Sequence, residues 1–254
     1  MKTLEKKRAL VTGAASGIGL AIVHEFHAKG MQVIASDVSA ARLAEVYGSL
    51  PGVRCLAADL SKKDTVMQLA QEAGPIDVLV NNAGLQHVSP IEKFDPTKWD
   101  LLIQVMLTAP FQLIQAALPG MYERNWGRII NVSSVHGLVA SPFKSAYVSA
   151  KHGLMGLTKV VAMEAGARSP NITCNAICPS YVRTPLVEKQ LADQALAHGI
   201  PQSEVLEKVL LTQNAIKRLI EPEEVAELAS FLCGEAAWSI TGTAQQMDAG
   251  WLAH

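Results

Sequence analysis

The chain has 254 residues, of which 49% are hydrophobic and 18% charged, so it is long and apolar enough for one sizeable buried core. Its formal net charge is −1, with neither sign in excess. That balance argues against a nucleic-acid surface and against binding to an anionic membrane.

Short β-branched runs alternate with helical stretches along the whole chain. This pattern predicts strands at 8–12, 32–36, 53–57, 76–80, 128–132, 171–177 and 244–247. It predicts helices between them at 17–29, 40–50, 62–73, 96–124 and 145–167. Repeated β-α units indicate a single α/β domain over 1–254, built as a doubly wound parallel sheet with helices on both faces.

Two stretches of this chain need separate comment. Residues 101–122 carry no formal charge and could span a bilayer by length, but they include Gln104, Pro110 and Pro119, so we expect a buried helix or a subunit interface. Residues 182–222 are less regular, with helical stretches near 182–198 and 202–211. We expect this insertion to be a lid over a site at the strand ends.

The termini and the cysteines bear on location. The N-terminal octapeptide MetLysThrLeuGluLysLysArg has no apolar run, so we expect no secretory signal and a cytoplasmic protein. The four cysteines form no CxxC pair, and we expect free, buried thiols at Cys55, Cys174, Cys178 and Cys233. No residues are assigned as metal ligands.

A glycine-rich loop, ThrGlyAlaAlaSerGlyIleGly at 12–19, follows the first strand and opens a helix. Gly13, Gly17 and Gly19 permit a tight turn and a close backbone approach to a pyrophosphate, which the helix N-terminus attracts. The spacing is GxxxGxG and differs from the usual GxGxxG fingerprint. A purely structural turn remains the alternative.

Asp37 ends the second strand, 20 positions after Gly17. A carboxylate there can accept hydrogen bonds from the adenosine ribose and would repel a 2′-phosphate, which favours NAD over NADP. Val38 stands where an arginine would favour NADP, although Arg42 is close in sequence. The alternative role for Asp37 is to cap the following helix.

Tyr147 and Lys151 are four residues apart on one predicted helix, so they share a face. A nearby ammonium stabilises the phenolate and allows the tyrosine to take a proton from an alcohol while hydride leaves the carbon. Ser134, just after the fifth strand, could hydrogen-bond the substrate oxygen. YxxxK alone also arises by chance on solvated helix faces. It supports a catalytic role here because Ser134 and the glycine-rich loop occur in the same chain.

The glycine loop, AsnAsnAlaGly at 81–84, Ser134 and Tyr147-x-x-x-Lys151 together resemble the short-chain dehydrogenase/reductase family over nearly the whole chain. The resemblance implies a Rossmann-type domain, usually a homotetramer. It implies that Asn82 supports the sheet and the ribose, that Asp59 contacts adenine, and that Val182 and Thr184 fix the nicotinamide amide. The implied cofactor-binding set is Gly13, Ser16, Gly17, Ile18, Gly19, Asp37, Asp59, Leu60, Asn82, Ala83, Gly84, Tyr147, Lys151, Pro179, Val182 and Thr184.

Two positions depart from the family pattern. Ser180 replaces a glycine that usually follows the proline of the ProSerTyrValArgThrPro segment. Met106 stands where the family commonly has an asparagine that holds a water relay to the lysine. Methionine offers only a weak acceptor sulfur, so the route by which the proton reaches solvent is open.

A narrower resemblance covers 85–90, 136–141, 144–147 and 183–190, which look like the D-3-hydroxybutyrate dehydrogenases of this family. It implies NAD-dependent interconversion of D-3-hydroxybutyrate and acetoacetate, a step of ketone body metabolism. It also implies that the substrate carboxylate is bound by Gln86, His136, Lys144 and Gln190. Taken singly, each of these has an ordinary structural or surface role as its alternative. Trp251 is expected to reach this pocket from a neighbouring subunit.

Two other functions stay open at this point. One is another enzyme of the same family, acting on a 3-oxoacyl thioester, a sugar or another secondary alcohol. The other is a non-catalytic dinucleotide-binding protein, because a fold does not fix a function. An intact Ser134, Tyr147 and Lys151 argues against the second alternative.

Overall fold

In the computed structural model, which describes residues 4–185, 187–188, 191, 195 and 199–253, the strands form one parallel sheet. Within those residues the sheet has seven strands in the order β3-β2-β1-β4-β5-β6-β7. The strands are β1 (Arg8–Thr12), β2 (Gln32–Asp37), β3 (Val53–Ala57), β4 (Val78–Asn81), β5 (Gly127–Val132), β6 (Ile172–Pro179) and β7 (Ala244–Met247). The predicted α/β architecture is confirmed.

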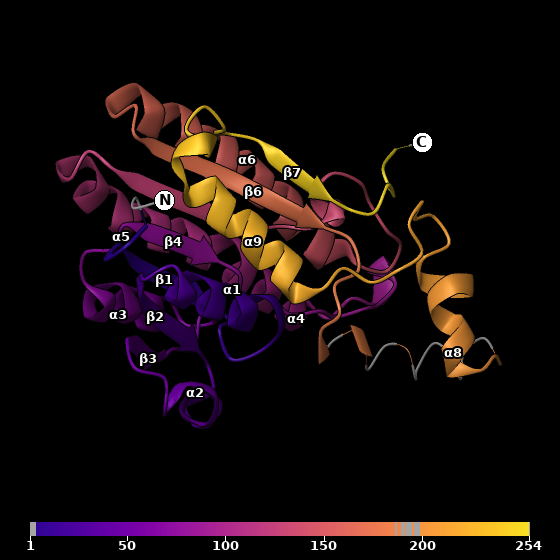
Figure 1. Ribbon diagram of the computed structural model, residues 1–254. Helices are drawn as coiled ribbons and strands as arrows, with labels where there is room; N and C mark the ends of the chain where they lie inside the picture. The colour runs from indigo at the N-terminus through magenta and orange to yellow at the C-terminus, as the bar shows by residue number, and fades with distance from the viewer. Residues whose placement is uncertain (1–3, 186, 189–190, 192–194, 196–198, 254) are drawn as a thin grey trace.

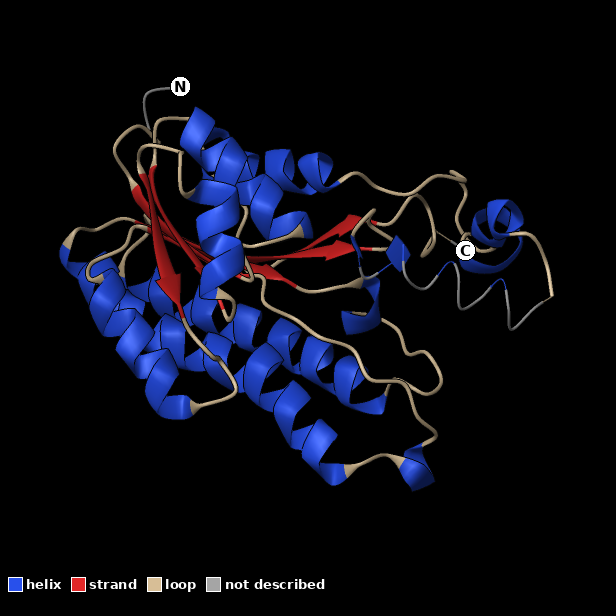
Figure 2. Ribbon diagram, turned by 90° about the horizontal axis from the view of Figure 1, so that it is seen from below, coloured by secondary structure: helices blue, strands red, loops and turns tan. Residues whose placement is uncertain are grey.

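Helices cover both faces of this sheet, which lies between them in Figure 2. The longer helices are α1 (Gly17–Ala28), α2 (Ala40–Tyr47), α3 (Lys63–Ala73), α4 (Pro96–Ile103), α5 (Ala109–Glu123), α6 (Ser145–Arg168) and α9 (Pro222–Cys233). One apolar cluster joins α1 and α9 to one face, and a second joins α3, α5 and α6 to the other. Short 3-10 turns lie at Ile91–Lys93, Val135–Gly137 and Glu235–Ala237.

The strand order reverses between β1 and β4, which are adjacent although β2 and β3 separate them in sequence (Figure 1). In doubly wound sheets, ligands bind outside the carboxyl ends of the strands at such a point. The loops after β1, β2 and β4 meet there. The topology therefore fixes where a cofactor site can form.

The long predicted helix at 96–124 is interrupted by a π-helical turn at Gln104–Thr108, which joins α4 to α5. Pro110 has no N–H to give the carbonyl of Met106 four residues earlier, so a regular α-helical ladder cannot continue through this point. Isolated π turns of this kind occur frequently at functional sites.

Within the described residues, one helix, Pro96–Glu123, is long and apolar enough to cross a membrane, with a mean hydropathy of 1.6 over its best window. It packs against α3 and α6, but only 44% of that window is buried, so the expectation of a buried helix is met in part. Phe111 is among its exposed side chains. The subunit interface stays a prediction for the exposed side.

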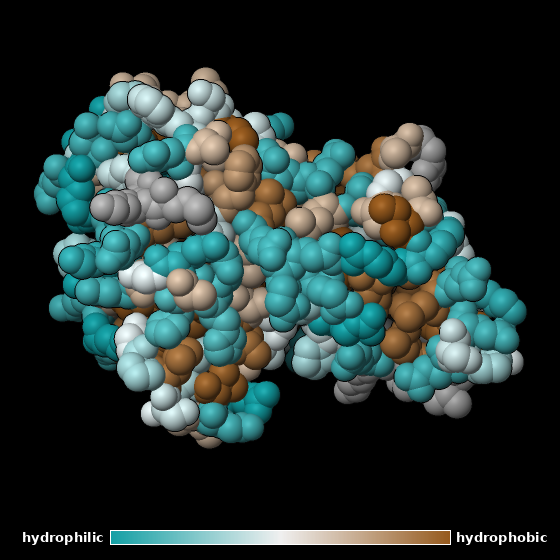
Figure 3. Space-filling model, viewed as in Figure 1, coloured by the Kyte–Doolittle hydropathy of each residue, from teal (hydrophilic) through white to brown (hydrophobic). Residues whose placement is uncertain are grey.

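Segment 182–222 projects from the sheet and carries α8 (Gln202–Val205) and a π turn at Leu206–Leu210 (Figure 1). These match the helical stretch expected near 202–211. Much of the stretch expected near 182–198 lies outside the described residues, and Val182 itself pairs with Ile220 in a β-bridge. The segment has its own small apolar cluster, and apolar side chains appear in brown at this end of the molecule in Figure 3.

The cysteines are all free, but they are not all buried as expected. Cys174, Cys178 and Cys233 are buried, whereas Cys55 is exposed. The prediction was wrong for Cys55 because β3 is the edge strand of the sheet, where side chains meet solvent. Among the described residues, no group of three or more His, Cys, Asp or Glu side chains is placed to hold a metal ion.

Two glycines give a sharp stability prediction. A Cβ on Gly19 would collide with the carbonyl oxygen of Gly13 and lie 2.6 Å from Nδ2 of Asn82, whereas a Cβ on Gly166 meets nothing within 4 Å. We expect Gly19→Ala to lower the free energy of unfolding by about 1–3 kcal/mol through overpacking. Gly166→Ala, in the last turn of α6, should raise it by about 0.5–1 kcal/mol. Urea denaturation of both variants measures this, and equal effects would contradict it.

Candidate active site

Two adjoining cavities lie at the carboxyl ends of the strands. One of about 320 Å³ is lined by residues from the ends of β2, β3 and β4, and one of about 300 Å³ reaches from the glycine loop to α6. Gly13, Asp37, Gly84 and Leu85 line both, so the two form one elongated groove. An extended ligand with two ends would fit this groove better than a compact one.

The glycine loop forms the middle of the groove. Gly13 and Gly17 have φ angles of 63° and 52°, in the left-handed region that favours glycine. A Cβ on Gly13 would lie 2.8 Å from Cα of Ala83, and one on Gly17 would lie 2.9 Å from Cγ2 of Thr184. Ser16, the N-cap of α1, makes no capping bond with its side chain, and the first turn holds no acidic residue. The loop is thus shaped and polarised for an anionic group.

The AsnAsnAlaGly segment after β4 braces this loop. Nδ2 of Asn82 donates to the carbonyl oxygens of Thr12 and Gly13, at 2.9 and 3.1 Å. Oγ1 of Thr12 accepts from the backbone N–H groups of Asn82 and Ala83, at 3.1 and 3.2 Å. These bonds fix the turn that the glycines allow.

The end of the groove that lies at β2 and β3 is acidic. Oδ2 of Asp37 accepts from the backbone N–H of Ala15 at 3.2 Å, and Oδ1 accepts from that of Ser39. Ser39, and not Asp37, is the N-cap of α2, which removes the capping alternative. Asp59 and Leu60 line this cavity too, and hydrogen bonds from Ser61 lower the pKa of Asp59.

No lysine or arginine is among the described residues that line this end. Val38 lines it and is exposed, whereas Arg42 forms an ion pair with Glu45 at 2.5 Å and lines a different cavity. Two carboxylates line this cavity, and Lys62, which does not line it, pairs with Asp59 at 3.6 Å.

The other end holds the predicted catalytic residues Ser134, Tyr147 and Lys151, all of which line the cavity. Lys151 is 5% exposed, and its Nζ donates to the carbonyl oxygen of Val132 at 2.7 Å and lies 5.6 Å from the centre of the Tyr147 ring. Burial lowers the pKa of Lys151 to about 8. The ammonium is thus held beside the phenol by a backbone carbonyl.

Opposing effects act on the phenol. Burial raises the pKa of Tyr147, and a hydrogen bond with the Ser134 side chain lowers it in part. Oγ of Ser134 also accepts from the backbone N–H of His136 at 3.2 Å, which fixes it at the start of a 3-10 turn. A positive charge brought into the groove would stabilise the phenolate further.

Two of the four predicted carboxylate-binding residues, His136 and Lys144, lie near Tyr147, and none of the three described ones lines the two cavities themselves. His136 is buried with its ring centre 6.1 Å from that of Tyr147, and its pKa is lowered to about 4 by burial and by the nearby Lys144 and His152. Burial also lowers the pKa of Lys144. Oε1 of Gln86 is buried without a partner in the described part of the chain, which leaves one polar atom to bind a ligand. Gln190, the fourth, lies outside the described residues.

Trp251 packs against His136 of its own chain. Its ring centre lies 5.3 Å from that of His136 in an edge-to-face arrangement. The C-terminal turn is bonded to the 213–216 stretch of the same chain, and a contribution from a neighbouring subunit stays a prediction.

Most of the remaining cofactor-binding candidates lie at the end of β6 or just after it. Pro179, Val182 and Thr184 line the cavity, as do Ile18 and Gly84, and the methyl group of Thr184 faces Gly17. Ser180, the departure from the family glycine, lines it as well, and its backbone N–H donates to the carbonyl of Met247.

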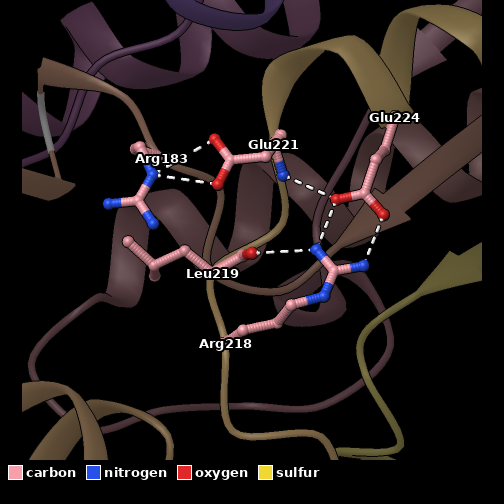
Figure 4. Close-up of polar contacts among 5 residues, drawn as sticks. All are labelled: Arg183, Arg218, Leu219, Glu221 and Glu224. Atoms are coloured by element: carbon pink, nitrogen blue, oxygen red, sulfur yellow. Dashed lines mark hydrogen bonds and ion pairs between the residues drawn. The ribbon is translucent and has the colours of Figure 1, made fainter.

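Ion pairs close the base of segment 182–222 (Figure 4). Nε of Arg183 donates to both carboxylate oxygens of Glu221, at 3.0 and 3.1 Å, and Arg218 makes two bonds of 2.6 and 2.7 Å to Glu224. Glu224 also accepts from the backbone N–H of Glu221, which completes a capping box at the start of α9. The first and last residues of segment 182–222 are thus held close together.

Met106 lies against the groove from the π turn. It is 1% exposed, and its sulfur lies 3.7 Å from where a Cβ on Gly84 would stand. We expect Met106→Asn to change activity by less than about tenfold, roughly 1.4 kcal/mol of barrier, because the lysine already has a backbone partner. Steady-state kinetics check this, and a much larger change in either direction would contradict it.

Comparisons with known proteins agree with this geometry. The family model described as short chain dehydrogenase matches residues 7–195. The chain belongs to the short-chain dehydrogenase family. It is 47% identical to a D-beta-hydroxybutyrate dehydrogenase of Rhizobium meliloti (strain 1021), over 97% of this chain and 99% of that protein.

Other relatives include a second protein of the same name and a reductase of a CoA thioester. The chain is 46% identical to a D-beta-hydroxybutyrate dehydrogenase of Cupriavidus necator, over 98% of this chain and 99% of the relative. It is 35% identical to an acetoacetyl-CoA reductase of Shinella zoogloeoides, over 95% and 97% of the two chains. The chain is therefore an oxidoreductase of this family that uses a nicotinamide dinucleotide. The groove fits that cofactor, because the glycine loop at the N-terminus of α1 lines its middle and the first turn of α1 holds no acidic residue to repel a pyrophosphate.

Sequence reasoning missed several groups that form this site. The carbonyl of Val132 holds Lys151, and Ser133 donates to the carbonyl of Lys151 at 3.3 Å. Backbone acceptors of this kind leave no mark in a sequence. Ser133 directly precedes Ser134 at the end of the strand, and this position is the only feature of the sequence that could have indicated its role.

Proposed function

We propose that this short-chain dehydrogenase interconverts D-3-hydroxybutyrate and acetoacetate with NAD. The observation that carries the proposal is that His136 packs near Tyr147, with Lys144 close to His136, beside the end of the groove that Ser134, Tyr147 and Lys151 line. Ser134, Tyr147 and Lys151 suit an alcohol, and His136 and Lys144 suit a small carboxylate; Gln86, whose buried Oε1 has no partner among the described residues, follows the groove residue Leu85 in sequence. The names of two relatives at 46–47% identity point to the same substrate.

When bound, NAD would accept the hydride from the carbon that bears the hydroxyl. Tyr147 takes the hydroxyl proton as the carbonyl forms, and returns it in the reverse direction. Lys151 stabilises the phenolate, and Ser134 hydrogen-bonds the substrate oxygen and orients it toward Tyr147. Lys144 and the N–H of neutral His136 bind the carboxylate, with Gln86 and Gln190 as further polar partners.

NAD is proposed over NADP because the adenosine end presents carboxylates. Asp37 would accept hydrogen bonds from the ribose hydroxyls and repel a 2′-phosphate, and the exposed Val38 supplies no compensating charge. Asp59 and Leu60 would contact adenine, and Thr184 and Val182 the nicotinamide amide. Ser16 and the N-terminus of α1 would bind the pyrophosphate.

We also propose a cytoplasmic homotetramer in which segment 182–222 acts as a lid. Exposed apolar side chains on α5 and α6, including Phe111, Val160 and Met163, support assembly, since large apolar patches mark interfaces. The free thiols suit a reducing compartment. Sedimentation measures the oligomeric state.

The test is an absorbance assay at about 340 nm, where the reduced nicotinamide absorbs, with D- and L-3-hydroxybutyrate, longer 3-hydroxy acids, a sugar alcohol, NAD and NADP. We expect reduction of NAD with the D acid and a much lower rate with the L acid or with NADP. In the reverse direction, acetoacetate should be reduced and acetoacetyl-CoA should not. No reduction of NAD with D-3-hydroxybutyrate would overturn the substrate assignment, and a preference for acetoacetyl-CoA would favour a thioester reductase.

A further inference from the structure

Asn214 is a buried polar residue that belongs to none of the motifs read from the sequence. It is 3% exposed and lies in the stretch between the π turn at Leu206–Leu210 and α9. Its Nδ2 donates to the carbonyl oxygen of Asp248 at 2.9 Å and to Oγ of Ser180 at 3.3 Å. The side-chain amide of Asn214 therefore connects Ser180, which lines the cavity after β6, to Asp248, which follows β7.

Asp248 starts a tight C-terminal turn. The carboxylate of Asp248 accepts from the backbone N–H groups of Gly250 and Leu252, at 3.0 and 2.9 Å. The carbonyl of Ala249 accepts from the N–H groups of Ala215 and Ile216, directly after Asn214. The turn is thus fixed internally by Asp248 and attached to the fold through the 214–216 stretch.

Trp251 is the side chain that this turn presents to the active site. Its ring packs edge-to-face on His136, lies 6.3 Å from the ring of Tyr181, and donates its Nε1–H to Gln213. His136 is one of the proposed carboxylate-binding residues, and it lies next to Tyr147. The imidazole thus lies between Oγ of Ser134, 3.5 Å from Nδ1, and a ring near the C-terminus.

We infer that Asn214 is a positioning residue for the substrate pocket, acting through Trp251 on His136. Its planar amide joins Ser180 in the cofactor cavity to the turn that carries Trp251, so the indole stays against the imidazole. Ser180, which stands where the family has glycine, supplies the hydroxyl that this link needs. The inference rests on the proposed function for its kinetic effect, but the link to Trp251 can be measured without any substrate.

The kinetic test compares Asn214→Ala with Thr212→Ala, an exposed residue of the same stretch that contacts neither Ser180 nor Asp248. Losing the buried bonds should raise KM for D-3-hydroxybutyrate about tenfold, with kcat and the Kd for NAD within about threefold of wild type. Thr212→Ala should match wild type. An unchanged KM for Asn214→Ala, whatever its effect on melting temperature, overturns the inference.

A double-mutant cycle tests the route through Trp251. If Asn214 acts through this ring, adding Asn214→Ala to Trp251→Phe should raise KM by less than about twofold beyond Trp251→Phe alone. Fully additive effects would mean that Asn214 acts by another route, and the proposal would fail.

Tryptophan fluorescence gives a readout that needs no substrate. The difference between wild type and Trp251→Phe isolates the emission of Trp251, and in Asn214→Ala this emission should shift to the red and be quenched more readily by acrylamide. If Asn214→Ala does not fold, Ser180→Gly removes one arm of the link and should give a smaller shift in the same direction. An unchanged Trp251 signal overturns the inference even if the substrate assignment stands. A shifted signal in a protein inactive on D-3-hydroxybutyrate overturns only the proposed substrate.

Discussion

Tyr147→Phe is expected to lower kcat by about 10²–10⁴-fold, the range that a positioned acid or base contributes, while the Kd for NAD stays unchanged. The phenol hydroxyl is the only group lost, and the ring that packs near His136 remains. Stopped-assay kinetics and titration calorimetry with NAD measure the two quantities separately.

Tyr122→Phe is the matched control for this change. Tyr122 lies in α5 at a distance from the groove, with its ring under the guanidinium of Arg168 at 4.2 Å. That variant should keep wild-type turnover. Turnover by Tyr147→Phe at the wild-type rate would show that another group moves the proton.

Lys144→Met should raise KM for D-3-hydroxybutyrate by about 10–150-fold, the value of a hydrogen bond to a charged group worth about 1.5–3 kcal/mol. The methionine keeps the apolar stem and removes the ammonium, so kcat should change far less than KM. Because burial lowers the pKa of Lys144, the wild-type lysine loses its charge at a lower pH than an exposed lysine does. KM should therefore rise with increasing pH before an ordinary lysine would deprotonate, and the variant should lack this rise.

Two comparisons separate charge recognition from general damage to the site. Lys159→Met removes an exposed lysine from the same helix and should leave KM unchanged. With the uncharged methyl ester of 3-hydroxybutyrate, wild type and Lys144→Met should differ little. An equal loss for the acid and the ester would contradict a role in binding the carboxylate.

The parts of the fold that were predictable are those with a local pattern. The strands come within about two residues of their predicted bounds, because continuous β-branched runs identify strands that are buried on both faces. The glycine loop was predictable for a similar reason, since left-handed backbone at Gly13 and Gly17 restricts the residue type.

The parts that were not predictable depend on contacts between distant segments. The π turn at Gln104–Thr108 has no signature of its own beyond Pro110. The contact of Trp251 with His136 requires the C-terminus to fold across the 213–216 stretch, which no spacing in the sequence reveals. Cys55 was misjudged because an apolar run does not say whether its strand lies at the edge of the sheet.

The closed base of segment 182–222 has a consequence for how this scaffold can change. Three contacts hold the two ends of segment 182–222 together: the Arg183–Glu221 ion pair, the Val182–Ile220 bridge and the Arg218–Glu224 ion pair. None of these residues is proposed to transfer the proton. A segment whose two ends are already held together can be lengthened, shortened or exchanged with little cost in loop-closure entropy. Substrate preference could therefore diverge between related proteins by replacing this one module, while Ser134, Tyr147 and Lys151 stay untouched on the sheet and on α6.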